Sequence, residues 1–394
     1  MSFIYKLKSQ VFKELCPYCF EYIDLKSAPF RCSNHNCAKE EDTIYEKHWG
    51  VKFKQRVIPT TGDFFERFKK SKTCDQCKTV TYKRICSSCH ETLPSTTGDY
   101  KNHIFAVIGG PDSGKTHYIA VLINLLMRKL GPEMDFILDA LDDETRKKYQ
   151  KDFYEPLFEK HEVIKKTKSA TANKNVQKPL VYGISMVKNN EVKNYLTLVF
   201  FDTAGEDLNS EDTMTVVNKY IYRSDGIIML IDPLQIVGVR DKLPDVPKPS
   251  VISSQSLDIL SRTTHLVQKG LRLKPTDKIN IPLAISFTKM DAIEELLEVD
   301  YQVKHKSNHY KGLNLGDIDA VNTEMKALLS EWDENALIQL ATTRYKASKF
   351  FGLSALGSNP HKTQKVDKII PNRIEDPFLW LLYKSGILKT KDQV

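Results

Sequence analysis

The 394-residue chain has no apolar run of the roughly 18 residues that a membrane-spanning helix needs. Its strongest apolar run, residues 227–231, has only the length of a strand, and its N-terminus lacks the apolar core of a secretory signal. Apolar residues make up 41% and charged residues 27%, which excludes a largely disordered, collagenous or coiled-coil chain. We therefore expect a globular, cytoplasmic protein of two to three domains that has no membrane partner.

Cysteine is absent from residues 101–394, since all eight cysteines lie between Cys16 and Cys89. A turn-rich segment, residues 91–103, follows the last of them. This distribution predicts a small head at residues 1–100 and a second domain at residues 101–394. Without a secretion signal, disulfides are disfavoured, and the cysteines are expected to bind metal.

The cysteines form four pairs with short internal spacing, which suits two tetrahedral Cys₄ zinc sites. The pairs are Cys16 with Cys19, Cys32 with Cys37, Cys74 with Cys77, and Cys86 with Cys89. Sequential pairing is simplest, with the first two pairs on one Zn²⁺ and the last two on the other. The alternative joins the first and last pairs at one metal and the middle pairs at the other. His35, His48 and His90 are further ligand candidates, although eight cysteines suffice.

We expect a structural role for the metals, because a β-rich head of about 100 residues with little apolar pattern needs such support. The formal net charge of +8 at first suggests an anionic partner. Eight thiolates and two Zn²⁺ ions would lower that charge to about +4, so charge alone does not argue for nucleic acid. Aromatic and basic residues alternate in the head and permit nucleic-acid recognition, but such residues more often form a small core and a solvated face: Trp49, Phe53, Arg56, Phe64, Phe65, Arg67 and Phe68.

Beyond the head, short apolar runs alternate with helical stretches, which indicates an α/β domain with helices on both faces of a parallel sheet. Strands are expected at residues 103–110, 180–187, 194–202, 226–232, 281–287 and 349–356. Helices are expected at residues 117–130, 139–163, 253–269 and 376–388, and a long helical region at residues 317–343. The charged stretch at 139–163 belongs to a helical insertion near residues 131–178.

Residues 109–116 (GGPDSGKT) fit the phosphate-loop motif G-x-x-x-x-G-K-[ST], between a predicted strand and a predicted helix. Such a loop curls so that main-chain N–H groups and the positive end of the helix face phosphate oxygens. Lys115 is expected to reach the β- and γ-phosphates, and Thr116 to bind Mg²⁺. The loop's other nucleotide contacts are expected from Gly109, Asp112, Ser113 and Gly114.

Three later segments predict GTP rather than ATP as the ligand. Residues 200–207 (FFDTAGED) carry D-x-x-G, in which Asp202 is expected to hold Mg²⁺ and Gly205 to contact the γ-phosphate. Residues 287–291 (FTKMD) supply Thr288, Lys289 and Asp291. The two acceptor oxygens of Asp291 match two donors on the edge of guanine that adenine lacks. The segment Ser354, Ala355 and Leu356 follows the last strand, where the main-chain N–H of Ala355 is expected to donate to the guanine carbonyl.

The order and placement of these motifs resemble the small-GTPase-like domains of the TRAFAC class. The resemblance covers roughly residues 101–394 and implies a mostly parallel six-stranded sheet with GTP or GDP at the carboxyl ends of its strands. A switch threonine should complete the Mg²⁺ site in the GTP state. Asp202 lies 87 positions after Lys115, and among the residues between them Thr171 is the favoured candidate, with Thr167 and Thr145 as alternatives.

Two residues depart from the pattern of small GTPases. Glu206 follows Gly205 where Ras-like proteins carry Gln, and an ionised Glu can only accept hydrogen bonds. We therefore predict slow hydrolysis until a partner or an ion completes the site. Asp112 stands where GTPases activated by a monovalent cation carry the Asn that binds K⁺. This position suggests K⁺-stimulated turnover, and the alternative is an ordinary surface turn.

The whole chain resembles the double-GTPase families of bacterial conflict systems, which are TRAFAC-type GTPases with an N-terminal double zinc ribbon. The segments that carry the resemblance are the three nucleotide motifs, CPYCF (16–20), CSSCHETLP (86–94) and EDPFLWLL (375–382). The resemblance implies a cytoplasmic switch that works with protein partners in bacterial antiviral defence.

Three functions remain open from the sequence. The first is a GTP-hydrolysing switch whose zinc head is an adaptor for a protein partner. The second is a nucleotide-binding module with little turnover, as Glu206 allows. The third is a nucleic-acid-associated GTPase, whose affinity for RNA or DNA would fall steeply with salt. Dimerisation of the GTP form is also left open.

Overall fold

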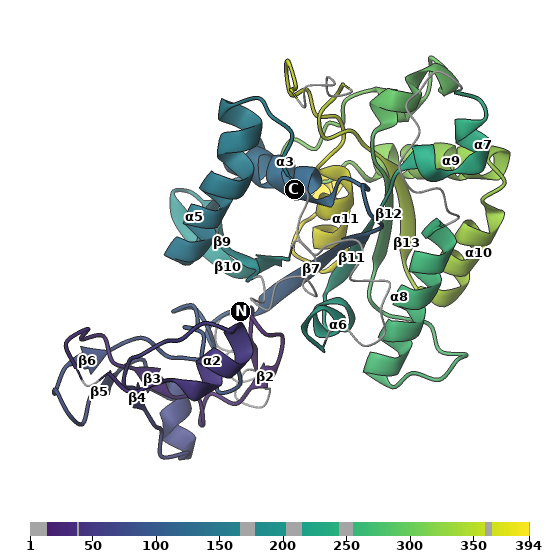
Figure 1. Ribbon diagram of the computed structural model, residues 1–394. Helices are drawn as coiled ribbons and strands as arrows, with labels where there is room; N and C mark the ends of the chain where they lie inside the picture. Colours follow the sequence, from purple (N-terminus) through teal and green to yellow (C-terminus); the bar gives the residue numbers. More distant parts are fainter. Residues whose placement is uncertain are drawn as a thin grey trace.

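A seven-stranded sheet forms the centre of residues 101–394, with strand order β13-β12-β11-β7-β10-β9-β8 (Figure 1). The computed structural model describes residues 14–37, 39–165, 178–201, 215–243, 255–358 and 365–393. The five strands from β13 to β10 run parallel. Strand β9 is antiparallel to β10, and β8 is antiparallel to β9. This sheet confirms the predicted α/β class.

The elements of this domain lie close to the expected positions. Its strands are β7 (Asn102–Gly109), β8 (Phe136–Ala140), β9 (Leu180–Lys188), β10 (Glu191–Phe200), β11 (Gly226–Ile231), β12 (Leu283–Phe287) and β13 (Ser348–Gly352). Its main helices are α3 (Lys115–Leu125), α4 (Gly131–Glu133), α5 (Asp143–Lys148), α6 (Thr215–Tyr222), α7 (Val237–Arg240), α8 (Gln255–Leu271), α9 (Leu315–Glu331), α10 (Asn335–Arg344) and α11 (Asp376–Lys384). Two π-helical segments, η2 (Leu126–Leu130) and η3 (Tyr149–Glu159), continue α3 and α5.

Two expectations about these elements were wrong. The sheet has a seventh strand, β8, inside the insertion that was expected to be helical. The helix expected at residues 139–163 begins only at α5, because residues 136–140 alternate buried and exposed side chains against β9. The long helical region expected at residues 317–343 is confirmed, and it consists of two helices, α9 and α10, separated by Asp333 in a left-handed conformation (φ 60°).

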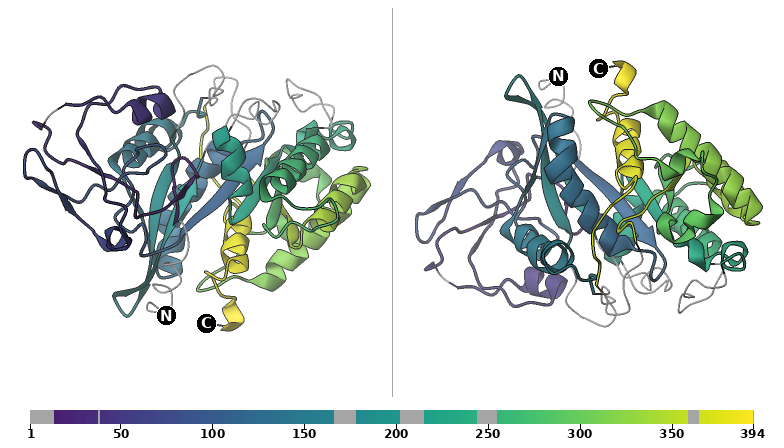
Figure 2. Two further views of the ribbon diagram at one scale, coloured as in Figure 1. Left: turned by 90° about the horizontal axis from the view of Figure 1, so that it is seen from below. Right: turned by 90° about the horizontal axis from the view of Figure 1, so that it is seen from above.

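Side chains of the central strands alternate between two apolar cores, one on each face of the sheet. In β7, Ile104 and Ala106 belong to one core, while Phe105 and Val107 belong to the other. The first core is completed by α6, α8, α9 and α10, and the second by α3, η3 and α11. Figures 1 and 2 show helices on both sides of the sheet. A parallel sheet requires such double cover because both of its faces are apolar.

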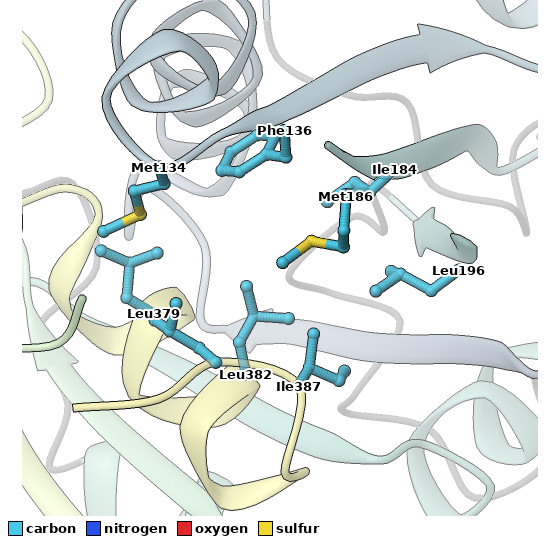
Figure 3. Close-up of a pocket in the computed structure, with 9 residues that line it drawn as sticks. Met134, Phe136, Ile184, Met186, Leu196, Leu379, Leu382 and Ile387 are labelled. Carbon is cyan, nitrogen blue, oxygen red and sulfur yellow. The ribbon is translucent and has the colours of Figure 1, made fainter. Parts of the chain in front are cut away.

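Helix α11 closes the second core at the antiparallel end of the sheet. Figure 3 shows Leu379 and Leu382 of this helix turned toward Met134, Phe136 and Met186, which come from the β8 and β9 side. The gap between these side chains is an apolar cavity of about 10 Å³, which is too small for a ligand. The segment EDPFLWLL is therefore a packing element of the fold.

Just before α11, Arg373 forms a buried ionic network. Its guanidinium lies 2.8 Å from Asp317 Oδ2 and 2.6 Å from Asp376 Oδ2, and its side chain is fully buried. His309 Nε2 lies 3.0 Å from the other oxygen of Asp376. Burial alone would raise the pKa of Asp317, but the guanidinium holds this pKa below its usual value. The cluster of His309 and two carboxylates is thus filled by an arginine, which leaves it no role as a cation site.

The described residues of the head form three two-stranded antiparallel sheets and a short helix. These sheets pair β1 (Glu14–Leu15) with β2 (Tyr22–Ile23), β3 (Phe30–Arg31) with β4 (Val57–Ile58), and β5 (Lys72–Thr73) with β6 (Val80–Thr81). Helix α2 (Thr43–Trp49) and the 3₁₀ segment η1 (Phe64–Phe68) complete it. Figure 1 shows the head in purple beside α6. In the described ranges, no helix is both long and apolar enough to cross a membrane.

Replacing Arg373 by Met should destabilise the protein by about 3–5 kcal/mol, because it leaves two carboxylates buried without a counter-charge. The measurement is urea unfolding at pH 7. The difference should narrow as the pH falls below about 4, since protonation of Asp317 removes the uncompensated charge and the network's contribution is lost in the wild type too. Arg146→Met removes an exposed ion pair and serves as control, with no measurable change expected. Equal stability of the two variants would contradict this reading.

Candidate functional site

The phosphate loop, residues 109–116, connects the end of β7 to the start of α3. Glycine is required at two positions of this loop, for different reasons. A Cβ on Gly109 would lie 2.5 Å from the Leu230 carbonyl oxygen of β11, so only glycine allows this close approach. Gly114 caps α3 in a left-handed conformation, with φ of 83°. Asp112 is also left-handed (φ 58°), so the loop turns sharply twice before the helix begins.

The side chain of Lys115 is folded back into its own loop. Its Nζ donates to the carbonyl oxygens of Gly109 and Gly110, each at 2.9 Å, and the side chain is buried. The Ser113 hydroxyl also donates to Gly110, at 2.8 Å. The loop therefore presents a buried cation at the carboxyl edge of the sheet. Thr116 lies half-buried in the first turn of α3.

The loops after β11, β12 and β13 meet the phosphate loop at this edge. Thr288 Oγ1 donates to the Ser113 carbonyl at 3.1 Å, which ties the expected base-reading loop to the phosphate loop. Asp291 accepts a hydrogen bond from the hydroxyl of Ser354, which follows β13. Ala355 and Leu356 lie in the same turn, where the Gly357 N–H donates back to Ser354 Oγ at 3.0 Å. The structure thus brings together the predicted site residues that it describes.

Three residues that the sequence did not single out also line these loops. Asp232, at the end of β11, is buried and pairs with Lys289 Nζ at 2.5 Å, which fixes that lysine. Gln235 donates from Nε2 to the Pro111 carbonyl at 3.0 Å and supports the phosphate loop. Asp232 directly follows an apolar strand, and this placement was the signal that could have found it.

His117, next to Thr116, is the third of these residues. Burial and the charge of Lys289 lower its pKa to about 4, so the ring is neutral near pH 7. Its Nε2 accepts a hydrogen bond from the Ile164 N–H at 3.2 Å. Only a neutral ring can accept in this way, so the low pKa and the contact agree. The contact fixes the chain shortly before the segment that holds Thr171.

Five predicted residues of the site lie outside the described residues: Asp202, Gly205, Glu206, Thr167 and Thr171. The other switch candidate, Thr145, is described, and its role as a switch residue is not favoured by its contacts. Its side chain is buried, donates to Asp142 Oδ2 at 3.1 Å and accepts from the Val181 N–H at 3.1 Å. These bonds give it a structural role at the start of α5.

The cysteines form two groups of four, but sequential pairing was wrong. The near group, so called because it lies against the sheet, contains Cys16, Cys19, Cys86 and Cys89. The far group contains Cys32, Cys37, Cys74 and Cys77. The pairs are therefore interleaved, as in the alternative arrangement. The three candidate histidines are not in either group, and His90 instead pairs with Asp42 at 2.8 Å.

Three of the four cysteine pairs share one turn geometry. The residue after the second cysteine is left-handed in each, with φ of 58° at Phe20, 60° at Lys78 and 56° at His90. Its N–H donates to the carbonyl of the first cysteine at 3.0–3.1 Å. The turn points both sulfur atoms to one side. This repeated geometry is what two thiolates need to converge on one ion.

The sulfur positions fit Zn²⁺. Closest approaches between pairs are 3.9 Å for Cys16–Cys89, 3.8 Å for Cys19–Cys86, 3.5 Å for Cys32–Cys77 and 3.9 Å for Cys37–Cys74. A regular tetrahedron with Zn–S bonds of about 2.3 Å has S···S edges of about 3.8 Å. A disulfide needs about 2.05 Å. Both groups are thus suited to a tetrahedral metal ion, and neither has the spacing of a disulfide.

The sheet, the phosphate loop at the end of β7 and the loops that meet it define a P-loop GTPase fold. Residues 103–343 match the Double-GTPase 2 family, and the chain belongs to this family. The match confirms the resemblance seen in the sequence. Membership of a GTPase family implies guanine-nucleotide binding.

A relative of this chain is SaeC of Mycolicibacterium smegmatis, provisionally described as an ESX-1 scaffolding and assembly protein. It is 25% identical over 326 residues, covering 77% of this chain and 80% of SaeC. Among solved structures, the GTPase-like domain of S. cerevisiae Ski7 bound to GTP is 16% identical, with a TM-score of 0.31, and covers 72% of this chain and 50% of its own.

Two further structures are similar at a comparable level. The signal recognition particle receptor SRb-GTP/SRX complex of Chaetomium thermophilum is 14% identical, with a TM-score of 0.30, covering 66% of this chain and 94% of that chain. A mutant of S. thermophilus NFeoB bound to GDP is 13% identical, with a TM-score of 0.25, covering 74% of this chain and 63% of that chain.

Two double variants distinguish the pairing of the cysteines by zinc content. Cys16→Ser with Cys86→Ser damages only the near group if the pairs are interleaved, so one of two zinc ions should remain. Cys16→Ser with Cys32→Ser damages both groups, so both ions should be lost. Sequential pairing gives the reverse result for the two variants. The measurement is zinc per chain by elemental mass spectrometry on the purified proteins.

Proposed function

We propose that the chain is a GTP-binding molecular switch of the TRAFAC type that hydrolyses GTP to GDP with Mg²⁺. The observation that carries this proposal is the convergence of the phosphate loop and the T-K-x-D loop. Thr288 connects the two loops, while Lys289 and Asp291 are each held by a partner from a neighbouring strand. A chance match of short motifs would not produce this arrangement at one edge of a sheet.

Base recognition is assigned to Asp291, with Lys289 beside the base. Ser354 donates to one carboxylate oxygen of Asp291, which fixes the plane of the carboxylate. The ion pair with Asp232 fixes the ammonium group of Lys289. The main-chain N–H of Ala355, with Ser354 and Leu356 on either side, completes recognition of the guanine carbonyl. Prior fixing of these groups lowers the entropy cost of binding the base.

Phosphate binding is assigned to the main chain of residues 109–116 and to Lys115. The lysine now bonds two carbonyl oxygens of its own loop, and the phosphates would offer it stronger, charge-assisted partners. Thr116 and Asp202 are the residues proposed to hold Mg²⁺. A hydroxyl and a carboxylate are the hard oxygen donors that this ion prefers, and it would neutralise charge on the phosphates.

Hydrolysis is proposed to depend on Gly205, Glu206 and Thr171, with Asp112 as a candidate ligand for K⁺. Because Glu206 cannot donate a hydrogen bond, turnover by the chain alone is expected to be slow. The alternative is a nucleotide-binding regulatory module with little turnover. Both share the nucleotide site and differ only in the rate of the chemical step.

The head is proposed to bind two structural Zn²⁺ ions and to act as an adaptor for a protein partner. Three phenylalanines of η1 support this role, since 53% of Phe64, 74% of Phe65 and 47% of Phe68 is exposed. Their rings contact one another at centroid distances of 5.5–5.8 Å, which makes an exposed apolar patch. The other aromatics of the sequence prediction, Trp49 and Phe53, pack in the head.

The name of SaeC supports work with protein partners, since it refers to scaffolding and assembly. A role in bacterial conflict or antiviral defence remains a proposal that rests on the family resemblance. A nucleic-acid partner is the weaker alternative, because η1 presents rings that already contact one another edge to face. Steep salt dependence of RNA or DNA binding would favour it.

Asp291→Asn should lower affinity for GDP roughly 100-fold, because it replaces charge-assisted hydrogen bonds to the guanine edge. A fluorescent GDP analogue displaced by GDP, GTP, ATP or xanthosine diphosphate gives the measurement. Xanthine has a carbonyl where guanine has an amino group, so the Asn variant should gain affinity for it. The exposed Asp300→Asn is the matched control. Equal competition by ATP in the wild type would make this an adenine-nucleotide protein instead.

Turnover of the purified wild type is expected to be far below tens of GTP per second. We expect it to rise in K⁺ relative to Na⁺, because a cation near Asp112 would offset charge that Glu206 cannot. A single-turnover assay in matched K⁺ and Na⁺ buffers measures both rates. Equal rates in the two salts remove the K⁺ proposal, and no turnover in either favours the regulatory module.

A further inference from the structure

The hydroxyl of Tyr220, in helix α6, lies where β7 and β10 separate. Parallel pairing between these strands runs from Asn102 with Thr197 to Ile104 with Val199 and then stops. Beyond that point the Tyr220 hydroxyl donates to the Phe105 carbonyl at 2.7 Å. It also accepts from the N–H groups of Val107 at 3.1 Å and Phe201 at 3.2 Å.

This position matters because both strands lead into proposed nucleotide loops. Val107 lies two residues before Gly109, where the phosphate loop begins, and Phe201 immediately precedes Asp202. One buried hydroxyl therefore replaces the ladder bonds between the two segments and sets their separation. Three main-chain groups depend on it, and they would otherwise have to find other partners in an apolar core.

The near cysteine group rests directly on this tyrosine. Phe20, the left-handed residue that follows Cys19, is fully buried, and its ring centroid lies 5.2 Å from that of Tyr220 and 5.9 Å from that of Phe201. The turn of Cys16 and Cys19 sets the position of Phe20, whose N–H donates to the Cys16 carbonyl at 3.1 Å. The near group and the sheet share one apolar core.

Polar contacts hold the near group against the same elements. Glu21 pairs with Lys219 at 2.5 Å and with Arg223 at 2.8 Å, on and just after α6. Glu91 pairs at 2.7 Å with Lys178, which precedes β9. The far group differs, because its apolar cluster, as far as the structure describes it, contains only head residues, among them Phe30 and Ile58.

We infer that Tyr220 is a positioning residue for the nucleotide site and that the near metal site, acting through Phe20, holds it in place. This inference rests on the proposed guanine-nucleotide function. Metal binding at the near group and nucleotide binding are then coupled, whereas the far group is not coupled to the nucleotide. By linkage, the coupling acts equally in both directions, so bound nucleotide raises zinc affinity at the near site only.

The first test uses variants that keep the cysteines. Tyr220→Phe removes only the hydroxyl, and Phe20→Ala removes the contact with Tyr220. Each should retain two zinc ions and bind GDP about 5- to 20-fold more weakly, within the usual range of coupling between sites. Phe20→Leu, which keeps apolar bulk, should recover most of the affinity. Leu382→Ala, which removes apolar packing where α11 meets the β8 and β9 side, should lose stability but bind GDP like the wild type well below its Tm, and this separates positioning from stability.

The second test compares the two metal sites with matched double variants. Cys74→Ser with Cys77→Ser leaves only the near zinc, and Cys86→Ser with Cys89→Ser leaves only the far zinc. Zinc affinity is measured by competition with a chromogenic chelator, with and without saturating GDP. GDP should raise zinc affinity about 5-fold or more in the first variant and leave it unchanged in the second.

Unchanged GDP affinity in both Tyr220→Phe and Phe20→Ala overturns the inference, as does an equal effect of GDP on both zinc ions. If the double variant Cys86→Ser with Cys89→Ser does not fold, other variants decide the question. These are Tyr220→Phe and Phe20→Ala for GDP affinity, and Cys74→Ser with Cys77→Ser for zinc affinity. If the wild type binds GDP and the variants bind it with equal affinity, the coupling is refuted and the proposed function is not. A wild type that binds no guanine nucleotide refutes the proposed function together with the coupling.

Discussion

Parallel alignment of β7, β11, β12 and β13 is the constraint on which the rest of the structure depends. Each strand is apolar on both faces, so the polar groups of this domain concentrate where the strands end. Because the strands run in one direction and in register, those ends meet at one edge. The phosphate loop, Asp232, the T-K-x-D loop and Ser354 are neighbours for this reason, although Ser354 lies 245 positions after Gly109 in the chain.

Because the strand ends share one edge, some parts of the site could be predicted from the sequence. Apolar runs of strand length followed by a motif predict both the strand and the place of the motif, and Lys115, Thr288 and Asp291 lie together as expected. The supporting contacts could not be predicted in the same way. Asp232 and Gln235 act through partners that are remote in sequence, and a single buried carboxylate has no pattern of its own. Strand β8 was missed although Phe136 and Leu138 alternate with exposed residues, because charged residues on either side favoured a helix.

The pairing of the cysteines could not be predicted because chain entropy hardly distinguishes the two arrangements. Interleaved pairing closes loops of 16–89 and 32–77, compared with 16–37 and 74–89 for sequential pairing. Loop-closure cost grows only with the logarithm of length, so the longer loops cost about 2 kcal/mol more in total. Zinc binding contributes roughly 10–16 kcal/mol per structural site. The choice is therefore left to packing, and packing favours the arrangement that places Phe20 and Trp49 in one core with the sheet.

Interleaved pairing places the loop closed by the far group inside the loop closed by the near group. This arrangement divides the head into two parts with different physical roles. The near group closes the outer loop and shares its apolar core, its ion pairs and Phe20 with the GTPase fold. The far group closes the inner loop and supports hairpins whose apolar contacts remain within the head. A partner that docks on the exposed rings of η1 would therefore meet a part of the head that the sheet does not hold. The near group offers such a partner a route to the nucleotide, because that group contacts α6 and the strand ends that α6 supports.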